Sequence, residues 1–202
     1  MRIGVLGSGS GTNCEAIMEA VARGTIPGRV VIVLSDRPDA PILDRARQRG
    51  IPAEFIGQSR FKSKLEPDLE QRAVTLLQEA DVNLVALAGY MRVIKQPLLA
   101  AYRGRILNIH PSLLPAFPGL HAWEQALQYG AKVTGCTVHF VNEGVDTGPI
   151  ILQESVPVQP TDTPASLHQR IQVIEHRLYP EAIRLFAKGK LRMVDRRVEV
   201  LP

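Results

Sequence analysis

Short apolar runs alternate with helix-length segments through the first 110 residues, and this alternation restricts the fold more than any other feature of the sequence. The apolar runs, several of them rich in valine, isoleucine and leucine on both faces, predict buried strands at 2–7, 30–35, 52–56, 82–88 and 105–110. Helical spacing, proline starts and glycine ends predict intervening helices at 12–24, 41–50 and 67–80. Strands connected through helices pair in parallel, so we expect an α/β fold with a mostly parallel sheet and helices on both faces.

The pattern changes after residue 130. Two strand-like runs, 132–141 and 149–158, are separated only by NEGVDTG and therefore favour antiparallel pairing. A long amphipathic helix is expected at 164–188, where Pro180 should kink or divide it. The last two strand-like runs, LRMVD and RVEVL, predict a small hairpin. Together these patterns indicate a Rossmann-like sheet with an antiparallel carboxyl-terminal part.

Composition and length place the chain among ordinary globular proteins. Its 202 residues are 45% hydrophobic and 22% charged, which suits one domain, 1–202, with halves 1–110 and 111–202. No apolar run reaches about 18 residues and the amino-terminal run is too short for a signal peptide, so we expect no membrane span and a cytoplasmic location. Cys14 and Cys136 show neither metal-site spacing nor a disulfide framework. The net charge of +4 fits either an anionic substrate or an ordinary surface.

A glycine-rich loop, GSGSGTN (7–13), lies between the first predicted strand and the first predicted helix. Glycines let backbone N–H groups approach an anion, and the helix amino terminus favours negative charge. The loop lacks the third glycine of a dinucleotide fingerprint, where it has Thr12, and it lacks the Lys-Ser/Thr pair of a P-loop. It therefore indicates either a phosphate monoester site or a tight turn without a ligand.

Asn108 and His110 stand two residues apart where a predicted strand ends. Positions i and i+2 of a strand point to the same face, so both polar side chains should project together while Ile109 enters the core. Pro111 should stop the strand. Ligands of open α/β sheets bind beyond the carboxyl ends of the strands, which makes this pair a candidate site; the alternative is a strand end whose histidine bonds the backbone.

Other polar residues have competing interpretations. Asp146 lies between two glycines in NEGVDTGP, and it could return to the same rim or only cap its own turn. Asp36 could bind the ribose of a nicotinamide cofactor, but SDRPDAP is better explained as a turn in which Asp39 caps the helix starting near Pro41. His139 alternates with apolar residues and is expected to be a strand histidine bonded within the core.

Five stretches together resemble the folate-dependent formyltransferase family, and within it the phosphoribosylglycinamide formyltransferases: GSGSGTN, LAGYMRVI, NIHPSLLPAFPG, TGCTVHFVNEGVDTGPIILQESVPV and IQVIEHRLYPEAI. The likeness covers nearly the whole chain in order. NIHPSLLP by itself is less specific, because formyltransferases and hydrolases that act on 10-formyltetrahydrofolate share it. The glycine loop and the short chain favour the phosphoribosylglycinamide formyltransferases.

The resemblance implies that the amine of glycinamide ribonucleotide attacks the formyl carbon of 10-formyltetrahydrofolate in purine biosynthesis. Asn108 and His110 would stabilise the oxyanion, and Asp146 would orient His110, favour its protonated form and help water to relay protons. The ribonucleotide would be held by Gly11, Thr12, Asn13 and Glu175. The folate would be held by Lys64, Met91, Arg92, Val93, Ile94, Asn142, Glu143, Gly144 and Val145.

The implied partners are small molecules, with no nucleic acid and no membrane, acting on a monomer or homodimer. The reduced folate is a co-substrate, and neither a metal nor a tightly bound cofactor is expected. Two other classes stay open: a 10-formyltetrahydrofolate hydrolase, in which water replaces the amine, and a nicotinamide-binding oxidoreductase on the same type of sheet.

Overall fold

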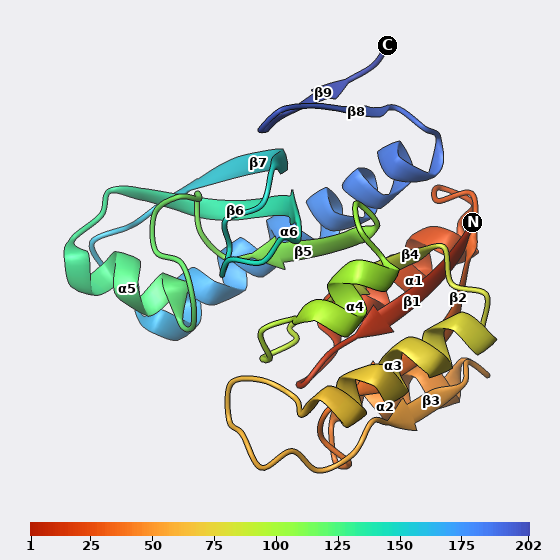
Figure 1. The fold of residues 1–202 in the computed structure, drawn as a ribbon. Coiled ribbons are helices and arrows are strands. Elements are labelled where there is room, and N and C mark those ends of the chain that lie inside the picture. The colour runs from red at the N-terminus through yellow and green to blue at the C-terminus, as the bar shows by residue number, and fades with distance from the viewer. The chain divides into compact units, whose positions relative to one another are not determined.

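Parallel strands in the order β3-β2-β1-β4 form the sheet at the amino-terminal end of the chain (Figure 1). The structure is a computed structural model that describes residues 1–202. It contains two compact units, Met1–Leu107 and Asn108–Pro202, and this sheet belongs to the first. The bounds of its strands are β1 Arg2–Leu6, β2 Arg29–Ser35, β3 Ala53–Phe55 and β4 Leu84–Leu87. Val5 of β1 pairs with Val33 and with Ala86, one on each side. All of β4 is buried, as the apolar runs predict for a parallel sheet covered on both faces.

Helices cover both faces of this sheet, with α3 and α4 on one face and α1 and α2 on the other (Figure 1). They span α1 Thr12–Ala22, α2 Pro41–Gln48, α3 Pro67–Glu79 and α4 Gln96–Ala101. The six-residue α4 was not predicted. The expected cap of α2 by Asp39 is wrong: the helix begins after Ala40 without a side-chain cap, and Asp39 instead forms an exposed ion pair with Arg37 at 3.2 Å. Pro41 already supplies a suitable helix start.

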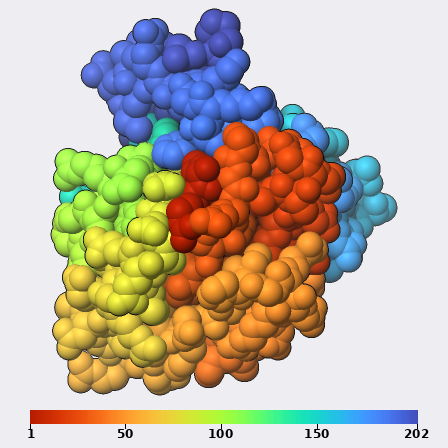
Figure 2. Space-filling view, turned by 90° about the vertical axis from the view of Figure 1, so that its right-hand side faces the viewer, coloured from red at the N-terminus to blue at the C-terminus, as the bar shows by residue number.

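The amino terminus is bound between two other segments of the same unit. Figure 2 shows it (dark red) between the chain that follows α1 (orange-red) and the chain that follows α3 (yellow). The backbone N–H of Arg29 donates to the carbonyl of Met1 at 2.9 Å. The Arg2 guanidinium donates twice to the carbonyl of Ala80, at 2.9 and 2.7 Å. These bonds anchor the first strand at its amino end.

The second unit contains the antiparallel part of the fold. Strand β5 (Ile106–His110) crosses the boundary between the units, and within the second unit the strand order is β5-β6-β7. Strands β6 (Val133–Phe140) and β7 (Ile150–Pro157) pair antiparallel, as predicted. The terminal strands β8 (Leu191–Val194) and β9 (Arg197–Val200) form the expected hairpin.

Two helices complete the second unit, α5 (Ala122–Tyr129) and α6 (Pro164–Ala187). Helix α5 was not predicted. Helix α6 starts with a capping box in which Thr163 and Ser166 exchange hydrogen bonds of 2.9 and 3.2 Å. Pro180 lies inside α6 without dividing it, so of the two expected outcomes, a kink or a division, the division is wrong.

The α/β fold class predicted from the sequence is confirmed, with a mostly parallel sheet, helices and an antiparallel carboxyl-terminal part. The single-domain organisation over 1–202 stays a prediction. None of the helices is long and apolar enough to cross a membrane.

Candidate active site

The carbonyl groups of the glycine loop are bonded to helices α1 and α2. The carbonyl of Gly9 accepts from the N–H of Ile42 at 3.2 Å, that of Ser10 from the Arg45 guanidinium at 2.8 Å, and that of Gly11 from Glu15 N–H at 2.9 Å. In a trans peptide the next residue's N–H points away from the carbonyl. The N–H groups of Ser10, Gly11 and Thr12 therefore each point away from the partner of the preceding carbonyl.

The loop has the properties of an anion site. The N–H groups of Ser10, Gly11 and Thr12 donate to no other group of the chain, and they lie at the amino terminus of α1. Gly11 has φ +77°, and a Cβ there would lie 2.7 Å from the Ile42 side chain, so both backbone and space require glycine. Asn13 follows in the first turn of the helix.

The predicted folate residues of the first unit differ in exposure. Met91 is exposed, Ile94 is buried, and the Arg92 side chain is largely buried against Asp36 at 2.6 Å. Lys64 keeps its ammonium 4.7 Å from the centre of the Phe61 ring. Of these residues, Met91 and Lys64 are the ones whose side chains face outward.

Strand β5 presents Asn108 and His110 as the alternation predicts. Ile109 is buried between them and the strand ends at His110, before Pro111. His110 Nε2 lies 2.8 Å from the carbonyl oxygen of Phe117, which can only accept, so Nε2 carries a proton. Its Nδ1 lies 3.3 Å from Oδ2 of Asp146.

Asp146 returns to the end of β5, as one of its two interpretations predicted. Its Oδ2 accepts from Gly119 N–H at 2.8 Å, and its Oδ1 accepts from Asn108 Nδ2 at 3.4 Å. The backbone of Asp146 is left-handed at φ +53°, a conformation that is uncommon outside glycine but that aspartate adopts more often than most residues. The loop bends sharply at Gly148, where a Cβ would lie 1.6 Å from the carbonyl oxygen of Phe140.

His139 also reaches this cluster, which the sequence did not predict. It is buried, and its Nδ1 lies 2.8 Å from the Phe140 carbonyl, as a strand histidine bonded within the core should be. Its Nε2, however, lies 3.2 Å from Asn108 Nδ2 and 3.7 Å from Asp146 Oδ1. The alternation of β6 gave the direction of the side chain, but only the pairing of the strands brings it to Asn108.

Burial and the neighbouring carboxylate act on the pKa of His110 in opposite directions. Burial lowers the pKa of His110 below its ordinary value and outweighs the raising effects of Asp146 and the Phe117 carbonyl. Burial alone would raise the pKa of Asp146, but the neighbouring imidazoles of His139 and His110 and the N–H of Gly119 hold it below its ordinary value. Asp146 thus acts on His110 in the expected direction, but it does not raise the net pKa of the histidine.

The remaining predicted residues of the second unit lie on the loop before Asp146 and on α6. Asn142 Oδ1 accepts from Gly144 N–H at 3.2 Å and from Thr147 Oγ1 at 2.8 Å, which shapes the turn. Val145 is exposed, whereas Glu175 is buried on α6. Their assignment to ligand binding, with that of Glu143, stays a prediction.

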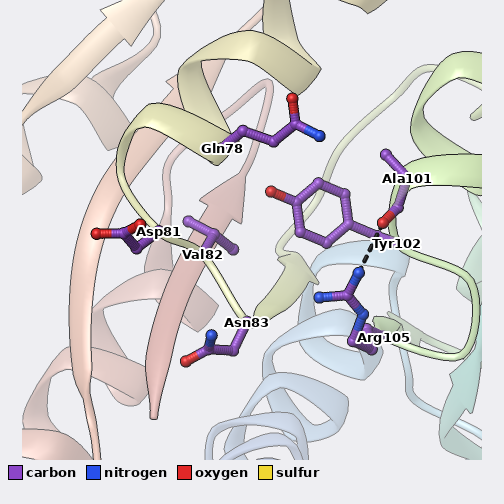
Figure 3. Close-up of a pocket in the computed structure, with 7 residues that line it drawn as sticks. All are labelled: Gln78, Asp81, Val82, Asn83, Ala101, Tyr102 and Arg105. Carbon is purple, nitrogen blue, oxygen red and sulfur yellow. Dashed lines mark hydrogen bonds between the residues drawn. The ribbon is translucent and has the colours of Figure 1, made fainter.

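One pocket of about 260 Å³ lies elsewhere in the first unit, at the amino ends of β4 and β5 (Figure 3). Arg105 donates to the carbonyl of Ala101 at 2.7 Å and covers the Tyr102 ring. The pocket is lined by Gln78, Asp81, Val82, Asn83, Ala101, Tyr102 and Arg105. It contains none of the predicted site residues.

The chain thus has a mostly parallel α/β fold, with a glycine loop in one unit and an Asn–His–Asp cluster in the other. The chain belongs to the formyl transferase family, whose model matches residues 1–183. The family resemblance predicted from the sequence is therefore confirmed.

Individual relatives agree with this assignment. The chain is 44% identical over 196 residues to phosphoribosylglycinamide formyltransferase of Escherichia coli (strain K12), covering 96% of this chain and 90% of that protein. It is 43% identical over 193 residues to the human trifunctional purine biosynthetic protein adenosine-3, covering 95% of this chain but only 19% of the human protein. The crystal structure of glycinamide ribonucleotide transformylase 1 from Symbiobacterium toebii matches with a TM-score of 0.95 at 54% identity, covering 100% of this chain and 94% of that one.

Proposed function

We propose that the protein transfers the formyl group of 10-formyltetrahydrofolate to the amine of glycinamide ribonucleotide, giving formylglycinamide ribonucleotide and tetrahydrofolate in purine biosynthesis. The observation that carries the proposal is the cluster of Asn108, His110 and Asp146, joined by contacts of 3.3 and 3.4 Å, in a chain of this family. Relatives of similar length that are named phosphoribosylglycinamide formyltransferase support the choice of acceptor.

In this mechanism the amine nitrogen attacks the formyl carbon, and the carbonyl electron pair moves to oxygen. Collapse of the intermediate breaks the bond to the folate nitrogen, while one proton leaves the amine and one reaches that nitrogen. Asn108 Nδ2 and His110 Nε2 supply the donors for the oxyanion. Because His110 Nε2 donates to the Phe117 carbonyl in the structure, the formyl oxygen must replace or share that acceptor. Asp146, with its lowered pKa, is the carboxylate that accepts a proton through water.

The two substrates are assigned to separate groups of residues. The N–H groups of Gly11 and Thr12, with Asn13, bind the phosphate of the ribonucleotide, and Glu175 contacts the ribonucleotide as well. The folate lies on Met91–Ile94, on Asn142–Val145 and, through its anionic tail, near Lys64. The folate is a co-substrate that leaves with each turnover, and no tightly bound cofactor or metal takes part.

We also infer a cytoplasmic enzyme that acts on small molecules as a monomer or homodimer. The two cysteines, Cys14 and Cys136, are free and buried, which suits a reducing compartment.

The test is to mix the protein with 10-formyltetrahydrofolate, with and without glycinamide ribonucleotide, and to follow the loss of the formyl group. Formyl loss only with the ribonucleotide, with formation of its formylated product, is the expected result. Equal loss without the ribonucleotide would identify a hydrolase instead. Tight binding of NADH would favour the nicotinamide class, against which Asp36 argues because both of its carboxylate oxygens already accept hydrogen bonds within the protein.

A further inference from the structure

A buried carboxylate joins the glycine loop to the segment that begins at Met91. Asp36 directly follows β2 and is 4% exposed. Its Oδ1 accepts from the hydroxyl of Ser8 at 2.5 Å, and its Oδ2 accepts from Nε of Arg92 at 2.6 Å. Each carboxylate oxygen therefore bonds a different segment, and both segments belong to the first unit.

Ser8 provides further bonds between the same segments. Its backbone N–H donates to the carbonyl of Gly89 at 3.0 Å, and its hydroxyl oxygen accepts from the N–H of Met91 at 2.9 Å. Because the hydroxyl donates to Asp36 and accepts from Met91, its orientation is fixed by both partners. The glycine loop and the Met91 segment are thus connected by backbone and side-chain bonds together.

Arg92 extends the network to a third segment. Its side chain is 13% exposed, and its Nη1 donates to the carbonyl of Phe61. The next residue, Val93, donates its N–H to the carbonyl of Ser63 at 2.8 Å. The charge and two of the donor nitrogens of Arg92 are therefore committed inside the protein, and its guanidinium is not presented as a free anion receptor.

The hydrogen bonds and ion pair of Asp36, Ser8 and Arg92 restrict the conformations of the loops that they connect. Removing one member of a buried ion pair leaves the other charge without compensation, which costs several times more than losing an exposed pair. The chain at 59–64 and 91–94 has no helix or strand of its own, so these side-chain bonds hold it in one conformation. A ligand that binds to an ordered segment does not have to pay its ordering entropy.

We propose that Asp36 is a positioning residue for the folate co-substrate: through Arg92 and Ser8 it holds Met91–Ile94 and the 59–64 loop in the conformation that binds the folate. Arg92 then serves this site through its backbone and its ion pair. The proposal rests on the proposed function, because it takes these segments as the folate site.

The experiment compares Asp36→Asn with a matched control, Asp39→Asn. Asp39 lies on the same turn, but its side chain is 70% exposed and pairs only with Arg37. For Asp36→Asn we expect the KM for 10-formyltetrahydrofolate and the Kd for tetrahydrofolate to rise about tenfold, with kcat at saturation changed far less. The control should keep wild-type values. A merely destabilised protein would lose active fraction, and so kcat, rather than folate affinity.

Limited trypsin digestion supplies a second measurement that needs no activity. The 59–64 loop contains Arg60, Lys62 and Lys64, and loss of the Arg92 tether should raise cleavage there about tenfold in Asp36→Asn but not in Asp39→Asn. If Asp36→Asn does not fold, Ser8→Ala removes a single uncharged partner and should show the same effects more weakly. Arg92→Gln combined with Asp36→Asn should weaken folate binding no more than the stronger single change, because both disable one pair.

The proposal is overturned if Asp36→Asn matches the control in both folate affinity and cleavage rate. It is also overturned if Arg92→Gln weakens folate binding strongly while Asp36→Asn does not, because Arg92 would then contact the folate directly. Absence of formyl transfer in the wild-type protein would instead reject the proposed function, while the trypsin comparison would still report on the network.

Discussion

Nε2 of His139 lies 3.2 Å from Nδ2 of Asn108, so a buried strand histidine contacts a proposed oxyanion donor. The Phe140 carbonyl, 2.8 Å from His139 Nδ1, requires the proton to be on Nδ1. In the neutral ring Nε2 is then the acceptor, and the amide nitrogen of Asn108, which also donates to Asp146 Oδ1 at 3.4 Å, faces His139. The histidine therefore fixes which way the Asn108 amide faces.

Replacing His139 should consequently lower kcat, because the Asn108 amide would no longer be held in its orientation. We expect His139→Leu to reduce kcat about tenfold, the equivalent of one lost orienting hydrogen bond of about 1.4 kcal/mol. His139→Gln can still accept from Asn108 and should retain more activity. Steady-state kinetics on the two folded variants make the comparison, and equal losses in both would contradict an orienting role.

A second prediction concerns Asn108 and His110, the two proposed donors to the oxyanion. Asn108→Ala or His110→Ala should each reduce kcat about 100- to 1000-fold while ground-state binding of both substrates changes little. Because both donors serve one oxygen, the double variant should lose less than the sum of the two single losses in free energy. Fully additive losses in this double-mutant cycle would count against a shared oxyanion.

Asp146→Asn separates charge from packing at the third member of the cluster. Asparagine keeps the size and one acceptor oxygen, so the variant should fold, but kcat should fall about 100- to 10,000-fold because the proton acceptor is lost. Ribonucleotide affinity, measured by calorimetry, should stay near the wild-type value. A variant with a near-normal rate and pH profile would return Asp146 to the interpretation of a turn residue.

The pKa of His110 gives a prediction with a defined sign. Because burial lowers it, its NMR titration midpoint should lie below 6.5, and Asp146→Asn should lower it further by removing the charge that raises it. A folded pKa below the unfolded value means that the unfolded state binds more protons between the two. The stability from this group is therefore fully present above about pH 6.5 and is lost as the pH falls towards the folded pKa. A midpoint above 6.5 would show that Asp146 outweighs burial.

Gly11→Ala tests the backbone anion site. Alanine at φ +77° is strained by about 1–2 kcal/mol, and its methyl group would also meet Ile42. We expect ribonucleotide binding to weaken at least about tenfold, with less effect on the folate. Gly24→Ala is the matched control, since φ is +73° there but the space is open and the site is at the far end of α1. Similar affinities of the wild-type protein for the ribonucleotide and its dephosphorylated analogue would show that the loop binds no phosphate.

The sequence by itself determined the helices and strands that are specified by patterns among residues close together in the chain. Apolar runs located the strands, Pro111 marked the end of β5 at His110, and alternation placed Asn108 and His110 on one face. The same local signals were too weak for the six residues of α4 and the eight of α5. They placed the start of α2 correctly at Pro41 but assigned its cap wrongly, because Asp39 pairs with Arg37 instead.

Tertiary structure alone decided which of these side chains meet. Asn108 and His139 are 31 residues apart, and Asp36 and Arg92 are 56 apart, so no local period relates them. Their contacts follow from strand pairing and from the paths of loops between strands. The direction of the His110 pKa shift was likewise decided by the fold. The sequence suggests a carboxylate beside the histidine, but the degree to which both groups are buried follows only from the tertiary structure.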